Sequence, residues 1–441
     1  MAKRKENTVL TKLRTRIKKR RATLSVIGLG YVGLPLAVEM AKAGLRVYGI
    51  DVDLAKVGMV NRGKSYVQDV SDADLRAVVR QGRLTATSDY SVLRRSDAID
   101  ICVPTPLRKT KDPDISYIID AVEHISRYLK RGQLIILEST TYPGTTEEVI
   151  LTRLEQKKLR VGEDFFLAFS PERVDPGNPT HKTANIPKVV GGITHRCTTV
   201  ACDLYRTCID SVVPVSSTTV AEMVKLLENT FRSVNIGLVN EMCLMCDRMG
   251  IDVWEVIEAA ATKPFGFLKF LPGPGLGGHC IPIDPFYLSW KAKMAGFEPR
   301  FIELAGQINA SMPDYVVAKV ADALNESRKS LKGSKVLILG VAYKANVNDT
   351  RESPAIDIMR ELGAKGAKVS FADPHVREIR VDGTLMRASR LSPKILKSND
   401  CAVIVADHAA FDYGMIVRGS RAIVDTRNAL RKYRARKIKR I

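Results

Sequence analysis

Short runs of apolar residues alternate with helical periods along the first half of the chain. From Thr23 onward the apolar runs are LSVIGLG, RVYGIDVD, AIDICVPTP, QLIILEST and FFLAFSPE, and the first is followed by a helical period over residues 34–43. Such alternation is typical of parallel βαβ units, whose strands are buried on both faces. The pattern predicts an α/β domain over residues 23–215.

The pattern changes near Ser216 and changes back near residue 331. The stretch TTVAEMVKLLENTFRSVNIGLVNEMCLMCDRMG has helical spacing and ends at a glycine suited to a helix C-terminus, so we predict a helix from about Val220 to Met249. It belongs to a helical middle domain over residues 216–330. Strand-like runs return as KVLILGVAY, VSFADP, CAVIVADH and AIVDTRN. The predicted fold class is α/β: two Rossmann-like α/β domains, the second over residues 331–441, joined by a long central helix and the helical middle domain.

Composition limits the class of protein. The chain has 441 residues, of which 45% are hydrophobic and 27% charged, as in globular proteins. No run approaches the ~18 apolar residues of a membrane-spanning helix, and residues 1–21 lack the apolar core of a signal peptide, so we expect a cytoplasmic protein without membrane insertion. The eight cysteines are scattered and predicted to stay reduced. Cys243 and Cys246 form C-x-x-C inside the long helix, which favours packing over a redox or metal site.

The net charge of +21 is concentrated at the two ends. Residues 1–22 carry +9 and residues 427–441 carry +8, which leaves +4 for residues 23–426. We interpret residues 1–22 as a basic N-terminal extension and the other end as a basic C-terminal tail. Because no zinc-finger, RRM or KH signature accompanies the charge, we expect no specific nucleic-acid partner.

A glycine-rich motif follows the first apolar run. Gly28, Gly30 and Gly33 form G-x-G-x-x-G between LSVI and the head of the predicted helix. In dinucleotide-binding folds the first glycine permits a tight turn, the second lets the backbone approach a pyrophosphate, and the third packs helix against strand. Asp51 ends the next strand-like run, where a carboxylate binds the adenosine ribose and disfavours the 2′-phosphate of NADP. Together these residues predict an NAD site.

Longer segments carry a resemblance to a known family. They are, in order, GLGYVGLP, ESTTYPGTT, SPERVDPGN, AEMVKLLENTFRSVN, GPGLGGHCIPIDPFYLSWKA and GVAYKANVNDTRESPA. On them, residues 23–428 resemble the UDP-glucose/UDP-N-acetylmannosamine dehydrogenase family. ATKPFGF followed by PGPGLGGHCIPIDPFYLSWKA is most similar to its UDP-N-acetyl-D-glucosamine 6-dehydrogenases. The resemblance implies an oxidoreductase that uses NAD on a UDP-sugar, for surface polysaccharide or glycan synthesis.

The resemblance implies that the sugar C6 alcohol is oxidised through an aldehyde to a carboxylate, with two NAD and one water. The second oxidation needs a nucleophile to make the aldehyde carbon tetrahedral, and a thiolate does this by forming a thiohemiacetal that becomes a thioester. Cys280 is the candidate, because it follows a glycine-rich loop and precedes a helix predicted to begin near Pro282. The N-terminus of that helix would lower the pKa of the thiol.

Four further residues complete the catalytic set. Lys225 and Asn229 are four apart and share a face of the long helix, where they can stabilise an alkoxide or oxyanion. By resemblance, Lys225 and Asp284 assist proton transfer and hold the water, and Glu172 helps to activate it for thioester hydrolysis.

The resemblance also implies two sets of binding residues. For the cofactor they are Gly28, Gly30, Tyr31, Val32, Gly33, Asp51, Pro104, Thr105, Thr140 and Arg351. For the substrate they are Glu172, Arg173, Lys225, Asn229, Phe267, Gly277, Tyr343, Lys344 and Arg427. No ligand constellation for a metal is evident, so we predict no catalytic metal. Apolar positions on more than one stripe of the long helix, together with the resemblance, predict a homodimer or larger assembly.

Three alternatives stay open at this point. The same chemistry on UDP-N-acetyl-D-mannosamine or UDP-glucose differs only at the sugar C2. A two-electron 3-hydroxyacid-type dehydrogenase shares the glycine motif but needs neither Cys280 nor a second α/β domain. A basic adaptor for RNA or membranes, carried by the two ends, is the non-enzymatic alternative.

Overall fold

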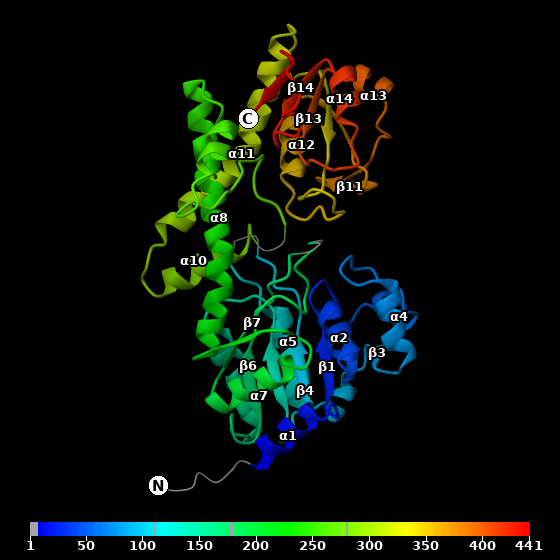
Figure 1. The fold of residues 1–441 in the computed structure, drawn as a ribbon, viewed down its shortest axis with the longest axis vertical. Coiled ribbons are helices and arrows are strands. Elements are labelled where there is room, and N and C mark those ends of the chain that lie inside the picture. The colour runs from blue at the N-terminus through cyan, green and yellow to red at the C-terminus, as the bar shows by residue number, and fades with distance from the viewer. Residues whose placement is uncertain (1–7, 109–111, 176–177, 179, 279–280) are drawn as a thin grey trace. The chain divides into compact units, whose positions relative to one another are not determined.

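The computed structural model describes residues 8–108, 112–175, 178, 180–278 and 281–441, and the chain forms two compact units (Figure 1). The first unit ends at Glu228 and the second begins at Asn229, so the division falls within one helix, α8 (Thr218–Met249). Each unit has its own sheet and its own buried core.

The sheet of the first unit has the strand order β3-β2-β1-β4-β5-β6-β7-β8. Its strands are β1 (Thr23–Ile27), β2 (Arg46–Ile50), β3 (Leu84–Thr87), β4 (Ala98–Ile101), β5 (Leu134–Leu137), β6 (Phe166–Phe169), β7 (Lys188–Gly192) and β8 (Val212–Val215). Neighbouring strands pair in parallel from β3 through β6, and β7 pairs in parallel with β8, but β6 and β7 pair antiparallel. The last two strands therefore run opposite to the rest.

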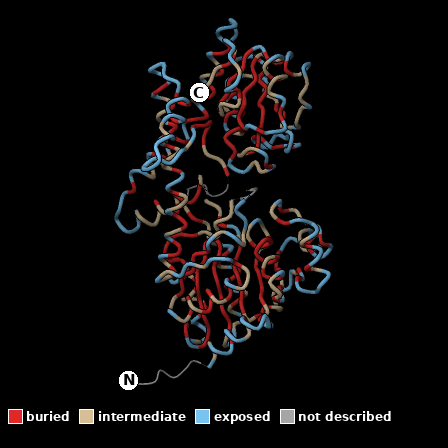
Figure 2. The backbone as a smooth tube through the Cα atoms, in the orientation of Figure 1, coloured by how far each residue is buried: buried red, intermediate tan, exposed pale blue. Residues whose placement is uncertain are grey.

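One helix precedes β1, and the other helices of the first unit, apart from the start of α8, lie between its strands. They are α1 (Thr8–Lys18), α2 (Gly33–Lys42), α3 (Leu54–Asn61), α4 (Asp72–Arg80), η1 (Tyr90–Arg95), α5 (Ser116–Tyr128), η2 (Thr146–Leu151), α6 (Thr152–Leu154), η3 (Glu155–Lys157) and α7 (His195–Tyr205). Apolar residues that alternate along a strand enter opposite cores: on β5, Leu134 and Ile136 belong to one buried cluster and Ile135 and Leu137 to another. Both faces of the sheet are thus covered, as the continuous apolar runs predict, and the buried positions gather on the strands (Figure 2).

The second unit contains a parallel sheet of order β10-β9-β13-β14-β15 and a hairpin. Its strands are β9 (Lys335–Leu339), β10 (Lys368–Ala372), β11 (Glu378–Val381), β12 (Thr384–Arg387), β13 (Cys401–Ile404), β14 (Ala422–Asp425) and β15 (Ile438–Arg440). Its helices, besides most of α8, are α9 (Val253–Ala260), α10 (Asp284–Met294), α11 (Arg300–Asn325), α12 (Pro354–Ala364), α13 (Pro393–Ser398) and α14 (Tyr413–Gly419). The prediction of two α/β regions and a long central helix is confirmed.

Parts of both basic ends are folded, and their description as an extension and a tail stays a prediction. Helix α1 buries Leu13 and Ile17 in the core of the first unit and packs against α7. Near the other end, β15 joins the second sheet, and Arg440 donates hydrogen bonds to the carbonyl oxygens of Leu430 and Tyr433 at 2.8 and 2.9 Å. Much of the positive charge therefore belongs to folded elements.

The long helix serves both units. The first eleven residues of α8 fall in the first unit and the others in the second. We expected a separate helical domain over residues 216–330, and the division into three domains stays a prediction. Cys243 and Cys246 are buried on α8 with free thiols, in accord with a packing role. Among the described residues, no helix is long and apolar enough to span a membrane.

Candidate active site

The three glycines of the loop after β1 differ in how much space a side chain would have. A Cβ atom at Gly28, whose φ is +91°, would lie 2.4 Å from the carbonyl oxygen of Cys102, and one at Gly33 would lie 1.9 Å from the carbonyl oxygen of Gly28. At Gly30 a Cβ atom would meet no atom within 4 Å. Gly28 and Gly33 are therefore required by the fold itself, while Gly30 leaves open space at the start of α2.

Asp51 ties this loop to the end of β2. Its Oδ2 accepts a hydrogen bond from the backbone of Leu29 at 2.9 Å, and its Oδ1 accepts one from Asp53, also at 2.9 Å. The residue is 8% exposed, so the carboxylate is fixed at the carboxyl end of the strand. An open backbone at a helix N-terminus and an acid after the second strand fit the diphosphate and the ribose of NAD.

The other predicted cofactor residues of the first unit follow the same end of the sheet. Tyr31, which is 40% exposed, and Val32 lead from the loop into α2. Pro104 and Thr105 come after β4, and Thr140 comes after β5. Because β1, β4 and β5 are parallel neighbours, these segments lie at one edge of the sheet.

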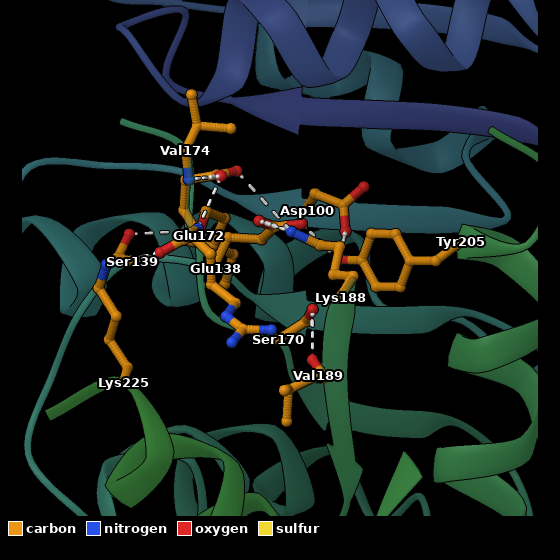
Figure 3. A network of polar contacts seen from close by, with 12 residues as sticks. Asp100, Glu138, Ser139, Ser170, Glu172, Val174, Lys188, Val189, Tyr205 and Lys225 are labelled. Atoms are coloured by element: carbon orange, nitrogen blue, oxygen red, sulfur yellow. Dashed lines mark hydrogen bonds and ion pairs between the residues drawn. The ribbon is translucent and has the colours of Figure 1, made fainter. Parts of the chain in front are cut away.

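Glu172 lies in the segment after β6, at this same edge (Figure 3). Its Oε1 accepts hydrogen bonds from the backbone of Arg173 and Val174, both at 2.7 Å. Lys225 of α8 is buried and donates to the carbonyl oxygen of Glu172 at 2.6 Å. The guanidinium of Arg173 instead forms a 2.6 Å ion pair with Glu228. The structure thus brings Glu172 and Lys225 together and directs Arg173 toward α8.

A buried ionic cluster beneath Glu172 was missed by the sequence analysis. Lys188 Nζ lies 2.7 Å from Glu138 Oε2, and the hydroxyl of Tyr205 donates to Glu138 Oε1 and lies 3.3 Å from Asp100 Oδ1 (Figure 3). The signal was available: Asp100 interrupts, Glu138 ends and Lys188 begins an apolar strand-like run. Charges in such positions are costly unless paired.

Glu222 of α8 is a second missed residue. Its carboxylate accepts hydrogen bonds from the backbone of Gly144 at 2.6 Å and from the backbone and hydroxyl of Thr146 at 2.9 and 2.7 Å. Burial raises the pKa of Glu222 to about 7, against the opposing effect of these donors. The residue fixes the segment that leads from Thr140 to η2.

In the second unit, two predicted catalytic residues are in direct contact. Asn229 Nδ2 donates to Asp284 Oδ2 at 2.5 Å, and Asp284 is 3% exposed in the first turn of α10. The predicted helix near Pro282 is present as α10, with Pro285 in its first turn. Cys280 lies outside the described residues, so its role as nucleophile stays a prediction.

The glycine loop before Cys280 packs against two predicted binding residues. A Cβ atom at Gly277 would lie 2.7 Å from Tyr343 Cβ, and one at Gly278, whose φ is +91°, would lie 2.9 Å from the Tyr343 ring. The backbone of Gly278 also donates to the carbonyl oxygen of Arg351 at 3.1 Å. The Arg351 guanidinium pairs with Asp349 at 2.6 Å. Only glycine permits this approach of the loop to Tyr343.

Arg427 contacts the same loop from the end of β14. Its Nε donates to the carbonyl oxygen of Val405 at 2.9 Å, and a Cβ atom at Gly273 would lie 2.5 Å from its Nη1. Lys344 lies after β9, at the carboxyl edge of the same parallel sheet. Phe267 is 36% exposed in the segment between α9 and α10 and is not brought to this loop by any contact that the described residues record.

Two buried asparagines, also missed, anchor the loop. Asn240 of α8 accepts a hydrogen bond from the backbone of Gly273 at 2.9 Å and donates to Asn309 Oδ1 at 2.8 Å. Asn309 of α11 in turn donates to the carbonyl oxygen of Ser233 at 3.1 Å. Polar residues inside apolar helical stripes were the available signal, although the pattern does not say which of them pair.

Within the described ranges, no group of three or more His, Cys, Asp or Glu side chains is arranged to hold a metal ion. That the enzyme needs no catalytic metal stays a prediction.

Comparisons with known proteins agree along most of the chain. Sequence models of the UDP-glucose/GDP-mannose dehydrogenase family match in three parts: the NAD-binding domain at residues 22–209, the central domain at 219–311 and the UDP-binding domain at 337–432. The chain is 39% identical to a UDP-N-acetyl-D-glucosamine 6-dehydrogenase of Pseudomonas aeruginosa, over 80% of this chain and 83% of that protein. It is 35% identical to a UDP-N-acetyl-D-mannosamine dehydrogenase of Pyrococcus horikoshii, over 93% and 96%.

Solved structures show the same likeness. The structure of the UDP-D-ManNAc dehydrogenase from Pyrococcus horikoshii matches 95% of this chain and 99% of its own, with a TM-score of 0.88 and 34% sequence identity. The glycine loop after β1, the position of Asp51 and the two α/β regions are the features expected of an NAD-binding enzyme with this fold. The relatives' names state dehydrogenase activities on UDP-sugars. The chain therefore belongs to the UDP-glucose/GDP-mannose dehydrogenase family, as an NAD-binding oxidoreductase of UDP-sugars.

Proposed function

We propose that the protein is an NAD-dependent UDP-N-acetyl-D-glucosamine 6-dehydrogenase. The observation that carries the choice of sugar is the 39% identity to the Pseudomonas aeruginosa enzyme of that name, supported by 36% identity to the one from Salmonella typhi. The product would be the corresponding uronic acid, a precursor for surface polysaccharide or glycan. A cytoplasmic location is part of the proposal and stays a prediction.

NAD, when bound, supplies the hydride acceptor for each of the two oxidations. Gly30 leaves the backbone at the start of α2 open for the diphosphate, and Asp51, fixed by the backbone of Leu29, is the proposed partner of the adenosine ribose. We assign Tyr31, Val32, Pro104, Thr105 and Thr140 to the same site because they follow the same sheet edge, and Arg351 by family resemblance.

Cys280 is the proposed nucleophile. In the first oxidation C6 loses a hydride and its hydroxyl loses a proton, which gives the aldehyde. The Cys280 thiolate then adds to C6, and the resulting alkoxide takes a proton to form a thiohemiacetal. Loss of that proton and of a second hydride gives a thioester, and water releases the carboxylate and the free thiol.

Four other side chains would move the protons and hold the water. Lys225 stabilises the oxyanion on C6, as does Asn229, whose amide is oriented by Asp284. Asp284 accepts and returns protons together with Lys225. Glu172 orients the attacking water toward the thioester, and the two backbone donors on its Oε1 fix the direction of its carboxylate.

The UDP moiety would bind to residues of the second unit. The cations Lys344 and Arg427 lie at the carboxyl ends of parallel strands, where a diphosphate is well placed. Tyr343 packs on Gly277 and is the candidate platform for uracil or sugar. Phe267 and Arg173 are proposed as further substrate contacts on family resemblance.

UDP-N-acetyl-D-mannosamine is the second candidate substrate. The TM-score of 0.88 and the 93% coverage of this chain favour it, because they come from proteins of that stated activity. The two sugars differ only in configuration at C2, so the same catalytic groups serve both. UDP-glucose, which lacks the acetamido group, is the third.

The deciding experiment measures kcat/KM for NADH formation with UDP-N-acetyl-D-glucosamine, UDP-N-acetyl-D-mannosamine and UDP-glucose, using one preparation. We expect UDP-N-acetyl-D-glucosamine to be favoured by about tenfold or more, the discrimination that ~1.4 kcal/mol of differential transition-state binding gives. Preference for another UDP-sugar would replace the substrate and keep the chemistry. No NADH from any would overturn the assignment.

A homodimer or larger assembly through α8 completes the proposal. Met223, Leu227 and Leu238 on this helix are 42%, 61% and 54% exposed in the single chain. Large apolar side chains exposed along one helix favour burial against another subunit. Light scattering of the purified protein is expected to give at least twice the mass of one chain, and the mass of one chain would contradict it.

A further inference from the structure

A buried cation, the ammonium of Lys188, lies beside the carboxylate of Glu172. Lys188 Nζ lies 3.8 Å from Glu172 Oε2 and 2.7 Å from Glu138 Oε2 (Figure 3). The side chains of Lys188 and Glu138 are 6% and 0% exposed, whereas that of Glu172 is 14% exposed. The ammonium is thus enclosed between two carboxylates, and the more exposed of them is a proposed member of the catalytic set.

The antiparallel pairing of β6 with β7 places the lysine there. Ala168 is opposite Gly192 and Phe169 is opposite Gly191, and the same register continued for three residues sets Glu172 opposite Lys188. The hydrogen bond of 2.8 Å from Ser170 Oγ to the carbonyl oxygen of Val189 follows the same alignment. If β7 ran parallel to β6, its first residue would lie at the other edge of the sheet. The reversal therefore brings a cation to the edge where Glu172 lies.

Other groups that surround the Lys188 ammonium keep it charged. Tyr205 donates to Glu138, and the ammonium lies 5.0 Å from the centre of the Tyr205 ring. Burial acts to lower the pKa of Lys188, but Glu138 and Glu172 outweigh it, and the pKa is raised above its ordinary value. Burial, with Glu138 next, raises the pKa of Asp100 well above its usual range. Burial raises the pKa of Glu138 as well, and the Lys188 ammonium opposes that rise.

Other ionisable groups also face Glu172. The Lys225 ammonium is on its carbonyl oxygen, and Arg173 is turned to Glu228. The Cys102 thiol is buried nearby, with a pKa raised by burial and by surrounding carboxylates, so it stays neutral. Lys188 is thus the cation that lies nearest to the Glu172 carboxylate among the ion pairs recorded for the described residues.

We propose that Lys188 is a positioning residue that directs the Glu172 carboxylate, so that it can hold the water that attacks the thioester. The inference rests on the proposed function for the role of Glu172, but the contact itself does not. Lys188 touches neither substrate nor water in this account and acts through Glu172. An opposite charge at this distance attracts the carboxylate oxygen and so limits the directions in which the side chain can point.

The test compares three backgrounds of the full-length protein: wild type, Glu138→Gln, and the double substitution Lys188→Met with Glu138→Gln. Lys188→Met alone leaves Glu138 buried without its cation and can fail to fold. The informative variant is therefore the double substitution Lys188→Met with Glu138→Gln, which removes both charges of the buried pair. Glu138→Gln alone is the matched control, because it keeps the lysine beside Glu172. Lys225 is present in every background, so its effect cancels.

The contact of the Glu172 carboxylate is read directly by infrared difference spectroscopy, in which each background is compared with the same background carrying Glu172→Gln. We expect the carboxylate stretching bands of Glu172 to move in the double variant relative to Glu138→Gln alone, because these two backgrounds differ only in the ammonium beside Oε2. Identical bands in these two backgrounds would overturn the inference, even if activity falls.

The kinetics of NADH formation with the UDP-sugar provide the second readout. In the double variant kcat should fall relative to Glu138→Gln with little change in KM, because Glu172 acts on the water after the substrate has bound. Equal kcat in these two backgrounds would refute the link between Lys188 and the water. Absence of turnover in wild type would instead count against the proposed function, while the infrared result still decides the contact.

Discussion

Replacing Gly30 by alanine separates NAD binding from folding. The added Cβ meets no atom within 4 Å, and φ at Gly30 is not in the left-handed region, so Gly30→Ala should change the free energy of unfolding by no more than about 0.5 kcal/mol. The methyl group would occupy the space through which the loop approaches the diphosphate. Losing one charge-assisted hydrogen bond of about 1.5–3 kcal/mol weakens NAD binding by about 10- to 100-fold.

Gly33→Ala is the matched control on the same loop. Its Cβ would lie 1.9 Å from the Gly28 carbonyl oxygen, so strand and helix must separate, at a cost of about 1–3 kcal/mol or more. Thermal unfolding and calorimetric titration with NAD should show Gly30→Ala with wild-type stability and weak binding, and Gly33→Ala with reduced stability. Wild-type affinity in Gly30→Ala, or a loss of stability as large as that of Gly33→Ala, would refute this account of the loop.

Three further predictions concern other residues of the site. Asp51→Asn should lower the ratio of NAD to NADP affinity by about tenfold, because a neutral amide no longer repels the 2′-phosphate; an unchanged ratio from titration with both cofactors would contradict this. Glu222 has a pKa of about 7 in the folded chain against an ordinary 4.5, so the folded state binds the extra proton and stability falls as pH rises between these values. In Glu222→Gln the loss of unfolding free energy between about pH 5 and about pH 8, measured in urea, should be smaller by roughly 2–3 kcal/mol, and an identical pH dependence would exclude the assignment. Cys280→Ser should abolish carboxylate formation, as product analysis can show; full double oxidation would favour a two-electron type of dehydrogenase instead.

The fold could be predicted where apolar runs and helical periods are long. The runs around β1, β2, β4, β5 and β6 were identified because parallel strands buried on both faces are continuously apolar. A run of apolar residues predicts a strand but not its direction in the sheet. KVVGG therefore gave no sign that its strand runs antiparallel to the preceding one. The antiparallel pairing of β6 and β7, and with it the place of Lys188, therefore emerged only from the structure.

The site was predictable where a motif fixes the backbone and not where distant residues pair. The roles inferred for Gly28, Gly30 and Gly33 from their spacing agree with what a Cβ would meet at each position. The pairing of Asn240 with Asn309 joins positions 69 residues apart, and no local spacing encodes it. The same holds for the contact between Lys188 and Glu138.

The most direct test of the central claim is the number of NADH formed per UDP-sugar consumed at the end point, with the preferred sugar limiting and NAD in excess. Two NADH per sugar, with a uronic acid as product, is the result that the account predicts, because an alcohol at C6 loses two hydrides on its way to a carboxylate. One NADH per sugar, with an aldehyde or ketone as product, would contradict the thioester mechanism and the role of Cys280.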